Sequence, residues 1–464
     1  MSQPTSNAAD GIASGRLTAE QLGCRFADVA PPLSVNAAVI AADRCHYCYD
    51  APCVAACPTG IDIPGFIRKI GNGNVKGAAR DILSANPLGG MCARVCPTEI
   101  LCEGACVRNH QDNEPVRIGA LQRHATDFQM AREAAGAPAL FKRASETGRH
   151  VAVIGAGPAG LACAHTLALA GHRVSVFDAR ERPGGLNEYG IAAYKTVDDY
   201  AQREVQWLLS LGGIELHQGQ RLGRDLTLAQ LRAAHDAVFV GVGLGGTHAL
   251  AVEGESLDGV LDAVDFIARL RAANDLSRVP VGRKVVVIGG GNTAIDAAVQ
   301  SRKLGAEQVT LAYRRGAAQM SATGAEQEFA RTQGVMLAEW MKPVRIVAAA
   351  GSARVQAVEF ERTSLDASGA LRSTGEIVRV EADMVLKAIG QTLLPEGLDG
   401  LERAAGGGRI AVDADGATSL EGVFAGGDCA GHGATDLTVQ AVQDGKLAAR
   451  AIDRFLANQS VKAA

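Results

Sequence analysis

Eight of the eleven cysteines in this chain gather in two short stretches, and their spacing suits metal-binding or electron-carrying chemistry. The first stretch reads "CHYCYDAPCVAACPTG" over residues 45–60, and the second reads "CARVCPTEILCEGAC" over residues 92–106. The clustered cysteines are Cys45, Cys48, Cys53, Cys57, Cys92, Cys96, Cys102 and Cys106. Thiols at such spacing form disulfides, bind zinc or hold iron–sulfur clusters.

The start of the chain argues against disulfides. Residues 1–23 are polar and small, and they lack the basic start and apolar core of a secretory signal peptide. No apolar run of about 18 residues occurs anywhere, so no membrane segment is expected. We therefore expect a cytoplasmic protein whose thiols stay reduced.

The first cysteine run favours iron–sulfur over zinc. Cys45-x2-Cys48-x4-Cys53-x3-Cys57 is followed by proline, and it differs from the bacterial ferredoxin run only in a longer middle gap. Structural zinc sites prefer paired C-x2-C elements, and the two stretches contain one such pair. The rest of the chain predicts a bound flavin, and zinc cannot accept an electron from a flavin. A zinc-structured nucleotide-binding module is the alternative from another class.

A glycine-rich turn follows the apolar stretch "VAVI", and a helix and a second strand ending at Asp178 come after it. In G-x-G-x-x-G the first glycine permits a tight turn, the second admits a pyrophosphate, and the third brings helix against strand. The helix N-terminus attracts the phosphates, and the acid can bind a ribose. Glycine turns also serve simple packing, but the complete order of elements favours a nucleotide. The predicted FAD turn comprises Gly155, Ala156, Gly157, Pro158, Ala159, Gly160 and Asp178.

A second unit of the same plan occupies residues 282–315 and carries the variant G-x-G-x-x-A. Its second strand ends in Arg314 and Arg315 instead of an acid. Arginine pairs with a 2′-phosphate that a carboxylate would repel, so NADP(H) is favoured over NAD(H), although two arginines also suit a solvated strand end. The predicted nicotinamide site comprises Gly289, Gly290, Gly291, Asn292, Thr293, Ala294, Arg314, Arg315, Ala388, Ile389 and Gly390.

Two further stretches resemble marks of FAD-binding flavoprotein reductases: "RPGGL" at residues 182–186 and "TSLEGVFAGGDCAG" at residues 418–431. In those families the late aspartate, here Asp428, meets the ribityl and phosphate region, and the helix beginning at "TVQ" faces the flavin ring. The resemblance adds Gly185, Leu186, Asp428, Thr438 and Val439 to the FAD site. A disulfide reductase is not expected, because Cys163 and Cys429 have no nearby partner in sequence.

The elements that position these residues change character near residue 145. A chain of 464 residues suggests about three domains. Its net charge is −4 and it has no basic runs, which excludes a nucleic-acid surface. Before residue 145, apolar residues recur at helical spacing; afterwards, strands and helices alternate. We predict an α+β multidomain fold: a helical iron–sulfur domain (1–145), then Rossmann-like α/β domains for FAD (146–248 plus 388–464) and NAD(P)H (249–387).

The cysteine stretches, "NPLGG", "RIGALQRHATD" and both nucleotide units together resemble dihydropyrimidine dehydrogenase. The likeness covers almost the whole chain. This chain resembles both the N-terminal half of the animal enzyme and the separate small subunit of the bacterial enzyme. The small subunit of glutamate synthase is similar in layout. The resemblance implies two [4Fe-4S] clusters, one held by Cys45, Cys48, Cys53 and Cys106, the other by Cys57, Cys96, Cys102 and Gln122. Cys92 is then a buried thiol.

The sequence departs from the family at two positions. The flavin-contacting arginine of the family is Lys195 here, which keeps the charge but loses the planar fork. A further arginine that follows the basic pair in the animal enzyme is Ser321 here. The expected preference for NADP(H) is therefore weaker than the arginine pair alone suggests.

By resemblance, the chain is expected to pass hydride from NAD(P)H to FAD and single electrons through two clusters to a partner. Only 33 residues follow Gly431, too few for the FMN-binding TIM barrel of about 250 residues that reduces pyrimidines in this family. We therefore expect an FMN-containing barrel-type catalytic subunit as partner, in a heterotetramer, and no catalytic residue here beyond the cofactors. The alternative is the small subunit of glutamate synthase.

Overall fold

A computed structural model describes residues 17–431, 433 and 435–462, so most of the polar opening segment lies outside the described residues. The chain divides into two compact units. The large unit comprises Ala30–Glu188, Asp198–Gly246 and the chain from Thr392, and the small unit comprises the chain up to Val29, Tyr189–Val197 and Thr247–Gln391. The expected helical and FAD-binding regions thus lie largely in one unit, whereas Tyr189–Val197 packs in the other.

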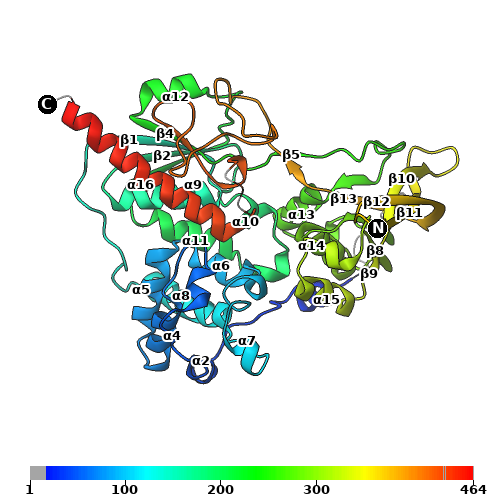
Figure 1. Cartoon of the computed structure of the whole chain (residues 1–464), viewed down its shortest axis with the longest axis horizontal. Coiled ribbons are helices and arrows are strands. Elements are labelled where there is room, and N and C mark those ends of the chain that lie inside the picture. Colours follow the sequence, from blue (N-terminus) through cyan, green and yellow to red (C-terminus); the bar gives the residue numbers. More distant parts are fainter. Residues whose placement is uncertain (1–16, 432, 434, 463–464) are drawn as a thin grey trace, which may run out of the picture. The chain divides into compact units, whose positions relative to one another are not determined.

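The large unit begins with short helices joined by cysteine-bearing loops (Figure 1, blue and cyan). These are α2 (Val35–Asp43), α3 (Pro52–Ala55), α4 (Ile63–Gly71), α5 (Val75–Ala85), α6 (Gly89–Val95), η2 (Thr98–Ile100), α7 (Arg108–Gln111) and α8 (Ile118–Ala134). The side chains of Asp62 and Asn74 accept backbone hydrogen bonds at the starts of α4 and α5, as N-caps do. Phe66, Ile67 and Ile70 then form a fully buried face of α4, which the helical spacing predicts.

A parallel five-stranded sheet forms the rest of the large unit. Its order is β15 (Val423–Ala425), β4 (Ala237–Val240), β1 (His150–Ile154), β2 (Arg173–Asp178) and β3 (Ile214–Gln218). Its helices are α9 (Pro158–Leu169), α11 (Tyr200–Leu209), α12 (Leu228–Ala234), η6 (Gly427–Cys429) and α16 (Thr438–Lys462). α9 packs against α16 so closely that a Cβ on Gly445 would lie 2.0 Å from the carbonyl oxygen of Ala159.

The small unit is built on a second parallel five-stranded sheet. Its order is β6 (Val260–Asp262), β13 (Met384–Ala388), β7 (Lys284–Gly289), β8 (Gln308–Ala312) and β9 (Met336–Ala338). The helical elements are α1 (Ala19–Arg25), η3 (Ala193–Lys195), α13 (Ala263–Ala272), η4 (Leu276–Arg278), α14 (Asn292–Leu304), η5 (Ala317–Gln319) and α15 (Gly324–Thr332). Three short elements occur where the chain passes between the units: α10 (Leu186–Tyr189), β5 (Gly246–Thr247) and β14 (Gln391–Thr392).

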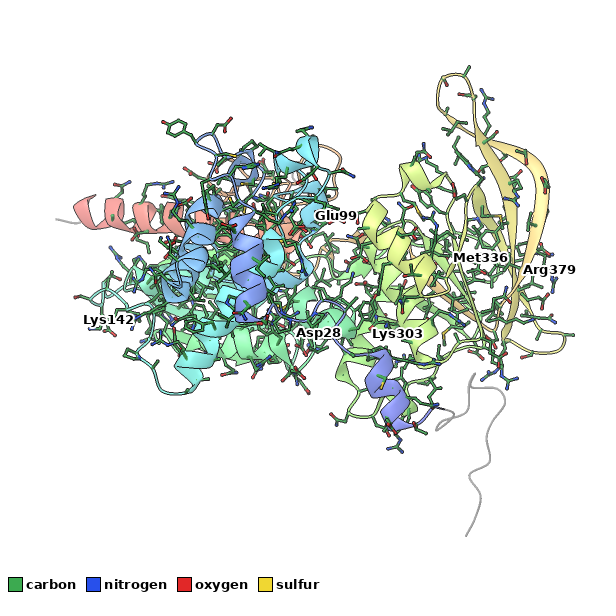
Figure 2. The ribbon with its side chains drawn as sticks, turned by 90° about the horizontal axis from the view of Figure 1, so that it is seen from below. Asp28, Glu99, Lys142, Lys303, Met336 and Arg379 are labelled. Carbon is green, nitrogen blue, oxygen red and sulfur yellow. The ribbon has the colours of Figure 1, made fainter. Side chains whose placement is uncertain are left out.

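The small unit also contains an antiparallel sheet of β10 (Met341–Ala348), β11 (Val355–Leu365) and β12 (Leu371–Glu381), where the sequence predicts alternating strands and helices. Figure 2 labels Met336 on β9 and Arg379 on β12. One face of β11 buries Val358 and Phe360, whereas its Glu359 forms ion pairs with Arg345 and Arg379 on the neighbouring strands. This two-sided pattern suits an antiparallel sheet with one solvated face.

The predicted fold class, a helical domain followed by two Rossmann-like α/β domains, is confirmed by the helices and the two parallel sheets. Each sheet places its glycine turn at the carboxyl end of a central strand, the usual nucleotide position in such folds. Within the described residues, no helix combines the length and apolar composition needed to cross a membrane.

Candidate cofactor sites

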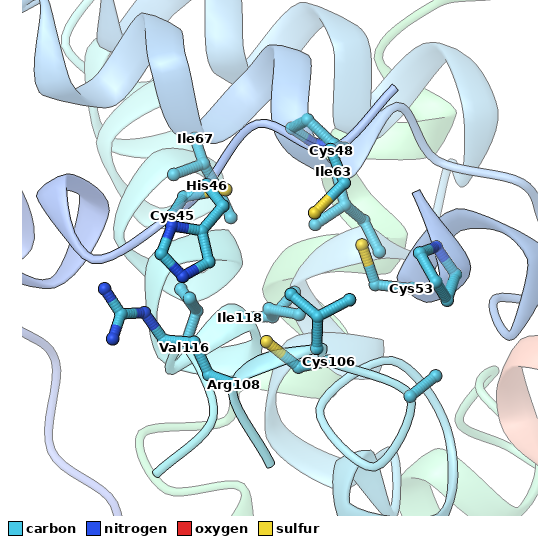
Figure 3. A pocket seen from close by; sticks show the side chains of 14 residues that line it. Cys45, His46, Cys48, Cys53, Ile63, Ile67, Cys106, Arg108, Val116 and Ile118 are labelled. Atoms are coloured by element: carbon cyan, nitrogen blue, oxygen red, sulfur yellow. The ribbon is translucent and has the colours of Figure 1, made fainter. Parts of the chain in front are cut away.

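Four cysteines of the first predicted cluster line one cavity of the large unit. Cys45 and Cys48 follow α2, Cys53 lies on α3, and Cys106 precedes α7. Apolar side chains complete the wall, among them Ile63, Ile67, Val116 and Ile118. Figure 3 shows the sulfur atoms of Cys48, Cys53 and Cys106 facing the shared space. The loop and the helix ends thus bring together thiols that are far apart in sequence.

Two thiols in this cavity, those of Cys45 and Cys53, are poorly suited to ionise without a metal. Burial raises the pKa of Cys45 and, to about 11, that of Cys53, and the charges of neighbouring cysteines add to both shifts. In the described residues, no three or more His, Cys, Asp or Glu side chains are placed to hold a single metal ion. Four separate thiols around one apolar cavity nevertheless fit a larger group that binds each of them as a thiolate.

A second cysteine group gathers Cys57, Cys96 and Cys102 from three separate segments. The hydrogen bond with the Cys92 thiol raises the pKa of Cys96, and burial and the nearby charges of Cys92, Cys102 and Cys57 add to the shift. Burial, Glu103 and Cys57 raise the pKa of Cys102. Cys92, on α6, is 2% exposed, so a further buried thiol of the second stretch lies beside the same group. The geometry leaves both Cys92 and Gln122 as candidates for a fourth ligand.

Gln122 lies in the second turn of α8 and is 7% exposed. Its side-chain nitrogen Nε2 donates a hydrogen bond of 2.7 Å to the carbonyl oxygen of Gly89, the first residue of α6. An amide whose nitrogen is engaged in this way presents its oxygen as the remaining ligand atom. The contact places Gln122 beside the helix that carries Cys92 and ends just before Cys96.

Glu204 is a residue of this region that the sequence did not single out. It lies fully buried on α11, and its Oε1 accepts hydrogen bonds from the backbone N–H groups of Gly90 (2.8 Å) and Met91 (3.1 Å). Burial raises the pKa of Glu204 to about 8, although these donors and Arg94 oppose the shift. Its carboxyl group therefore holds the start of α6 against α11. A single glutamate in an amphipathic helix carries no sequence mark of such a contact.

The first glycine turn has the predicted geometry. Gly155 has a φ of 100°, and a Cβ there would lie 2.3 Å from the carbonyl oxygen of Gly241, so only glycine fits. α9 begins at Pro158 directly after the turn, and its free N–H groups are available to phosphate oxygens. Asp178 accepts hydrogen bonds from the backbone of Ala156 (2.6 Å) and Arg180 (2.8 Å), and burial raises its pKa. The acid thus supports the turn itself.

Other predicted FAD residues surround this turn. A Cβ on Gly185 would lie 2.8 Å from the Cα of Gly157, so "RPGGL" packs directly on the glycine turn. Thr438 begins α16, and its hydroxyl donates to the side-chain oxygen of Asn187 (3.0 Å), the residue after Leu186. Asp428 lies in η6 at the end of β15. Within the large unit, the stretches at residues 182–186 and 418–431 therefore both lie around one helix N-terminus.

Lys195 differs from these residues because it packs within the small unit. Its Nζ forms ion pairs with Asp296 on α14 (2.8 Å) and Glu326 on α15 (2.6 Å). Burial alone disfavours the charged ammonium, but the two carboxylates outweigh it and raise the pKa of Lys195. The side chain is thus held by carboxylates of the small unit.

The second glycine turn lies at the end of β7, and α14 begins there at Asn292. A Cβ on Gly289 would lie 2.2 Å from the carbonyl oxygen of Ala388, so the end of β13 adjoins the turn, as predicted for residues 388–390. Arg314 and Arg315 follow β8, and their carbonyl oxygens accept hydrogen bonds from Thr363 and Trp340. Within the described chain, neither guanidinium forms an ion pair.

Two family models match the chain. Dihydropyrimidine dehydrogenase domain II, 4Fe-4S cluster, matches residues 23–134, and pyridine nucleotide-disulphide oxidoreductase matches residues 149–445. The NAD-dependent dihydropyrimidine dehydrogenase subunit PreT of Salmonella typhimurium is 35% identical over 431 residues, 92% of this chain and 97% of that protein. The glutamate synthase [NADPH] small chain of Escherichia coli is 35% identical over 457 residues, 93% of this chain and 94% of that protein. The chain belongs to the dihydropyrimidine dehydrogenase and glutamate synthase small-subunit family.

Membership of this small-subunit family confirms the predicted resemblance and the class of protein: an iron–sulfur flavin oxidoreductase that serves as an electron-input subunit. A solved structure, FprA of Mycobacterium tuberculosis in complex with NADPH, has a TM-score of 0.58 and 20% identity, with 68% of this chain and 86% of that chain covered. That likeness shows the fold of the part of the chain that it covers, and the 4Fe-4S family model matches residues 23–134.

Proposed function

We propose that this chain is the electron-input subunit of a dihydropyrimidine dehydrogenase, which reduces uracil and thymine to 5,6-dihydropyrimidines. The cavity shared by Cys45, Cys48, Cys53 and Cys106 carries the proposal, because a subunit that passes electrons onward needs a cluster. The match to a PreT subunit over nearly the whole of both chains supports the choice of enzyme.

The residues that would hold the redox groups follow from the two cysteine groups and the first glycine turn. Cys45, Cys48, Cys53 and Cys106 would bind one [4Fe-4S] cluster, and Cys57, Cys96, Cys102 and Gln122 would bind a second. When bound, FAD accepts a hydride from NAD(P)H, and the clusters carry electrons away singly. The chain itself supplies thiolates, backbone N–H groups for the pyrophosphate and apolar walls that exclude water. Because burial raises the pKa of Cys45 and Cys53, each thiol must release a proton when the metal binds.

The second glycine turn would bind the nicotinamide nucleotide, and we propose that it prefers NADP(H) to NAD(H). Arg314 is exposed at the end of β8, and neither it nor Arg315 is engaged in an ion pair in the described chain. Free guanidinium groups at this position can pair with a 2′-phosphate. The two relatives are named for different nucleotides, NAD for the PreT subunit and NADPH for the glutamate synthase chain.

The proposed partner is an FMN-containing barrel-type catalytic subunit, joined to this chain in a heterotetramer. Purified with FAD and clusters, the chain should reduce an artificial dye with NAD(P)H but leave uracil unchanged. Adding the FMN-containing subunit of a dihydropyrimidine dehydrogenase should start formation of dihydrouracil, measured by chromatography. Uracil reduction by this chain alone would contradict the proposed division of labour.

Glutamate synthase is the second candidate, because its small chain from Escherichia coli matches with the same identity over a similar length. The same preparation mixed with a glutamate synthase large subunit, glutamine and 2-oxoglutarate distinguishes the two. Formation of glutamate there, without dihydrouracil in the first mixture, would assign the chain to the synthase.

A further inference from the structure

A tryptophan in an unusual backbone conformation lies beside the predicted nicotinamide-nucleotide site of the small unit. Trp340 comes two residues after the end of β9, and its φ is 62°, in the left-handed region. A bulky side chain seldom occupies that region, because its Cβ crowds the backbone there. Such strain persists only where neighbouring contacts fix it, and it gathers at ligand-binding sites. The placement of Trp340 therefore calls for an explanation beyond packing.

Hydrogen bonds on both sides hold the Trp340 backbone in place. Its N–H donates to the carbonyl oxygen of Arg315 (3.1 Å), and its carbonyl oxygen accepts from the N–H of Thr363 on β11 (3.0 Å). The hydroxyl of Thr363 in turn donates to the carbonyl oxygen of Arg314 (2.7 Å). Trp340 is thus tied both to the basic pair that follows β8 and to β11.

The ring of Trp340 packs against the residue that follows the basic pair. A Cβ on Gly316 would lie only 2.7 Å from Cζ2 of the indole, so a larger residue there would displace the ring. The Trp340 side chain is partly buried, and its indole N–H has no hydrogen-bond partner among the described residues. In the same part of the chain, no other aromatic ring or cation packs on it. The indole is therefore available to a ligand.

The chain after β8 is the place at which a nucleotide in this fold presents its adenosine ribose. An acid or an arginine there binds the 2′ oxygen of that ribose. The same ribose carries the adenine, so a nucleotide bound by Arg314 and Arg315 places its adenine one sugar away from them. Trp340 lies at this place, because its backbone is bonded to Arg315 and its ring contacts Gly316. An indole offers the flat apolar surface on which a base stacks.

We propose that Trp340 binds the adenine ring of the nicotinamide dinucleotide by stacking, as a specificity-determining residue of the second nucleotide site. The inference rests on the proposed function, because it requires a dinucleotide at the second glycine turn. Stacking recognises the base and not the 2′ substituent, so Trp340 serves NAD(H) and NADP(H) alike, whereas the arginine pair distinguishes them. The affinity then comes from a part of the nucleotide remote from the transferred hydride.

The chain contains two tryptophans, so the fluorescence of Trp340 can be observed alone. W207F removes the other indole, which lies in the large unit, and keeps an aromatic ring in its place. The full chain, loaded with FAD and clusters, is titrated with adenosine 2′,5′-bisphosphate, adenosine 5′-monophosphate and nicotinamide mononucleotide. None of these donates a hydride, so the signal reports binding and not turnover.

In W207F, an adenine nucleotide should quench the Trp340 fluorescence saturably, because a stacked base relaxes the excited indole. Nicotinamide mononucleotide should leave the fluorescence unchanged. W340F, which retains Trp207, should show no quenching by any of the three ligands.

Calorimetric titration measures the affinity itself. W340N should bind the adenine nucleotides about tenfold more weakly than the wild type, because the stacking surface is lost. Asparagine suits the left-handed conformation, so W340N removes the ring without adding backbone strain. W340F keeps a smaller ring and should lose less affinity, and W207F should bind as the wild type does.

Binding of an adenine nucleotide without quenching of Trp340 would overturn the proposal, as would wild-type affinity in W340N. If W340N does not fold, the fluorescence of W207F and W340F decides. If neither the adenine nucleotides nor NADP(H) and NAD(H) bind the wild type, the second nucleotide site of the proposed function fails, and the role of Trp340 fails with it.

Discussion

The side-chain nitrogen of Gln122 lies 2.7 Å from the carbonyl oxygen of Gly89. This hydrogen bond joins the second turn of α8 to the first residue of α6, the helix that carries Cys92 and ends just before Cys96. It orients the amide so that the oxygen is the atom left for a metal, as the proposed second cluster requires. Cys92, buried on α6 and hydrogen-bonded to Cys96, is the competing ligand.

Gln122→Ala should therefore perturb one cluster and leave the other intact. Iron content should fall, or the magnetic resonance signal of one cluster should change, because the ligand oxygen is lost. FAD content and dye reduction by NAD(P)H should stay close to wild type, since the glycine turns are untouched.

Cys92→Ala provides the control for this assignment. If Gln122 is the ligand, the Cys92 variant should retain both clusters. Retention of both clusters with unchanged potentials in Gln122→Ala, together with cluster loss in Cys92→Ala, would make Cys92 the ligand.

Replacing both Arg314 and Arg315 with glutamate should weaken NADPH much more than NADH. Each lost charged hydrogen bond is worth about 1.5–3 kcal/mol, or about tenfold or more in affinity. The measurement is KM and kcat for dye reduction with each nucleotide. An equal loss with both nucleotides would show that the arginine pair does not bind a 2′-phosphate.

Glu204→Gln should reduce the dependence of stability on pH. The folded pKa of about 8 lies above the ordinary value of 4.5, so between these values the folded chain holds more protons than the unfolded chain. Stability therefore falls as pH rises through this window, and the amide removes that contribution while keeping an acceptor for Gly90. Thermal unfolding of the full chain from about pH 5 to about pH 8 measures the difference.

An exposed glutamate supplies the comparison for Glu204. Glu215→Gln, whose side chain is 64% exposed, should leave the pH dependence as in the wild type. The same slope in the Glu204 and Glu215 variants would mean that Glu204 is charged throughout the window.

Lys195→Met should destabilise the chain, because it leaves the buried Asp296 and the partly buried Glu326 without their cation. Removing one partner of a buried pair costs about 3–5 kcal/mol, whereas Lys195→Arg keeps the charge. Urea unfolding of the three proteins measures the loss. A stable Lys195→Met protein with an altered flavin spectrum would favour the flavin contact implied by the family instead.

Local chemistry explains why much of the site could be predicted. A glycine turn between an apolar strand and a helix is encoded within a few residues, so Gly155 and its neighbours were identifiable before any packing was known. The cysteine spacing likewise indicated iron–sulfur chemistry, because Cys45, Cys48 and Cys53 lie within one loop and the helix after it. The antiparallel sheet β10–β12 was missed, since pairing between strands depends on contacts that no single segment specifies.

The sequence by itself determined the fold class, the two nucleotide turns and the thiols available to metal, because each depends on residue type and short spacing. The family resemblance grouped Cys106 with Cys45, and the tertiary structure places both in one cavity. Only the tertiary structure decided that Lys195 pairs with Asp296 and Glu326, and that Glu204 and Lys446 are buried beside the cysteine-bearing helices. These contacts join segments far apart in the chain. Their electrostatics arise from burial, which a charged side chain acquires only when other elements pack over it.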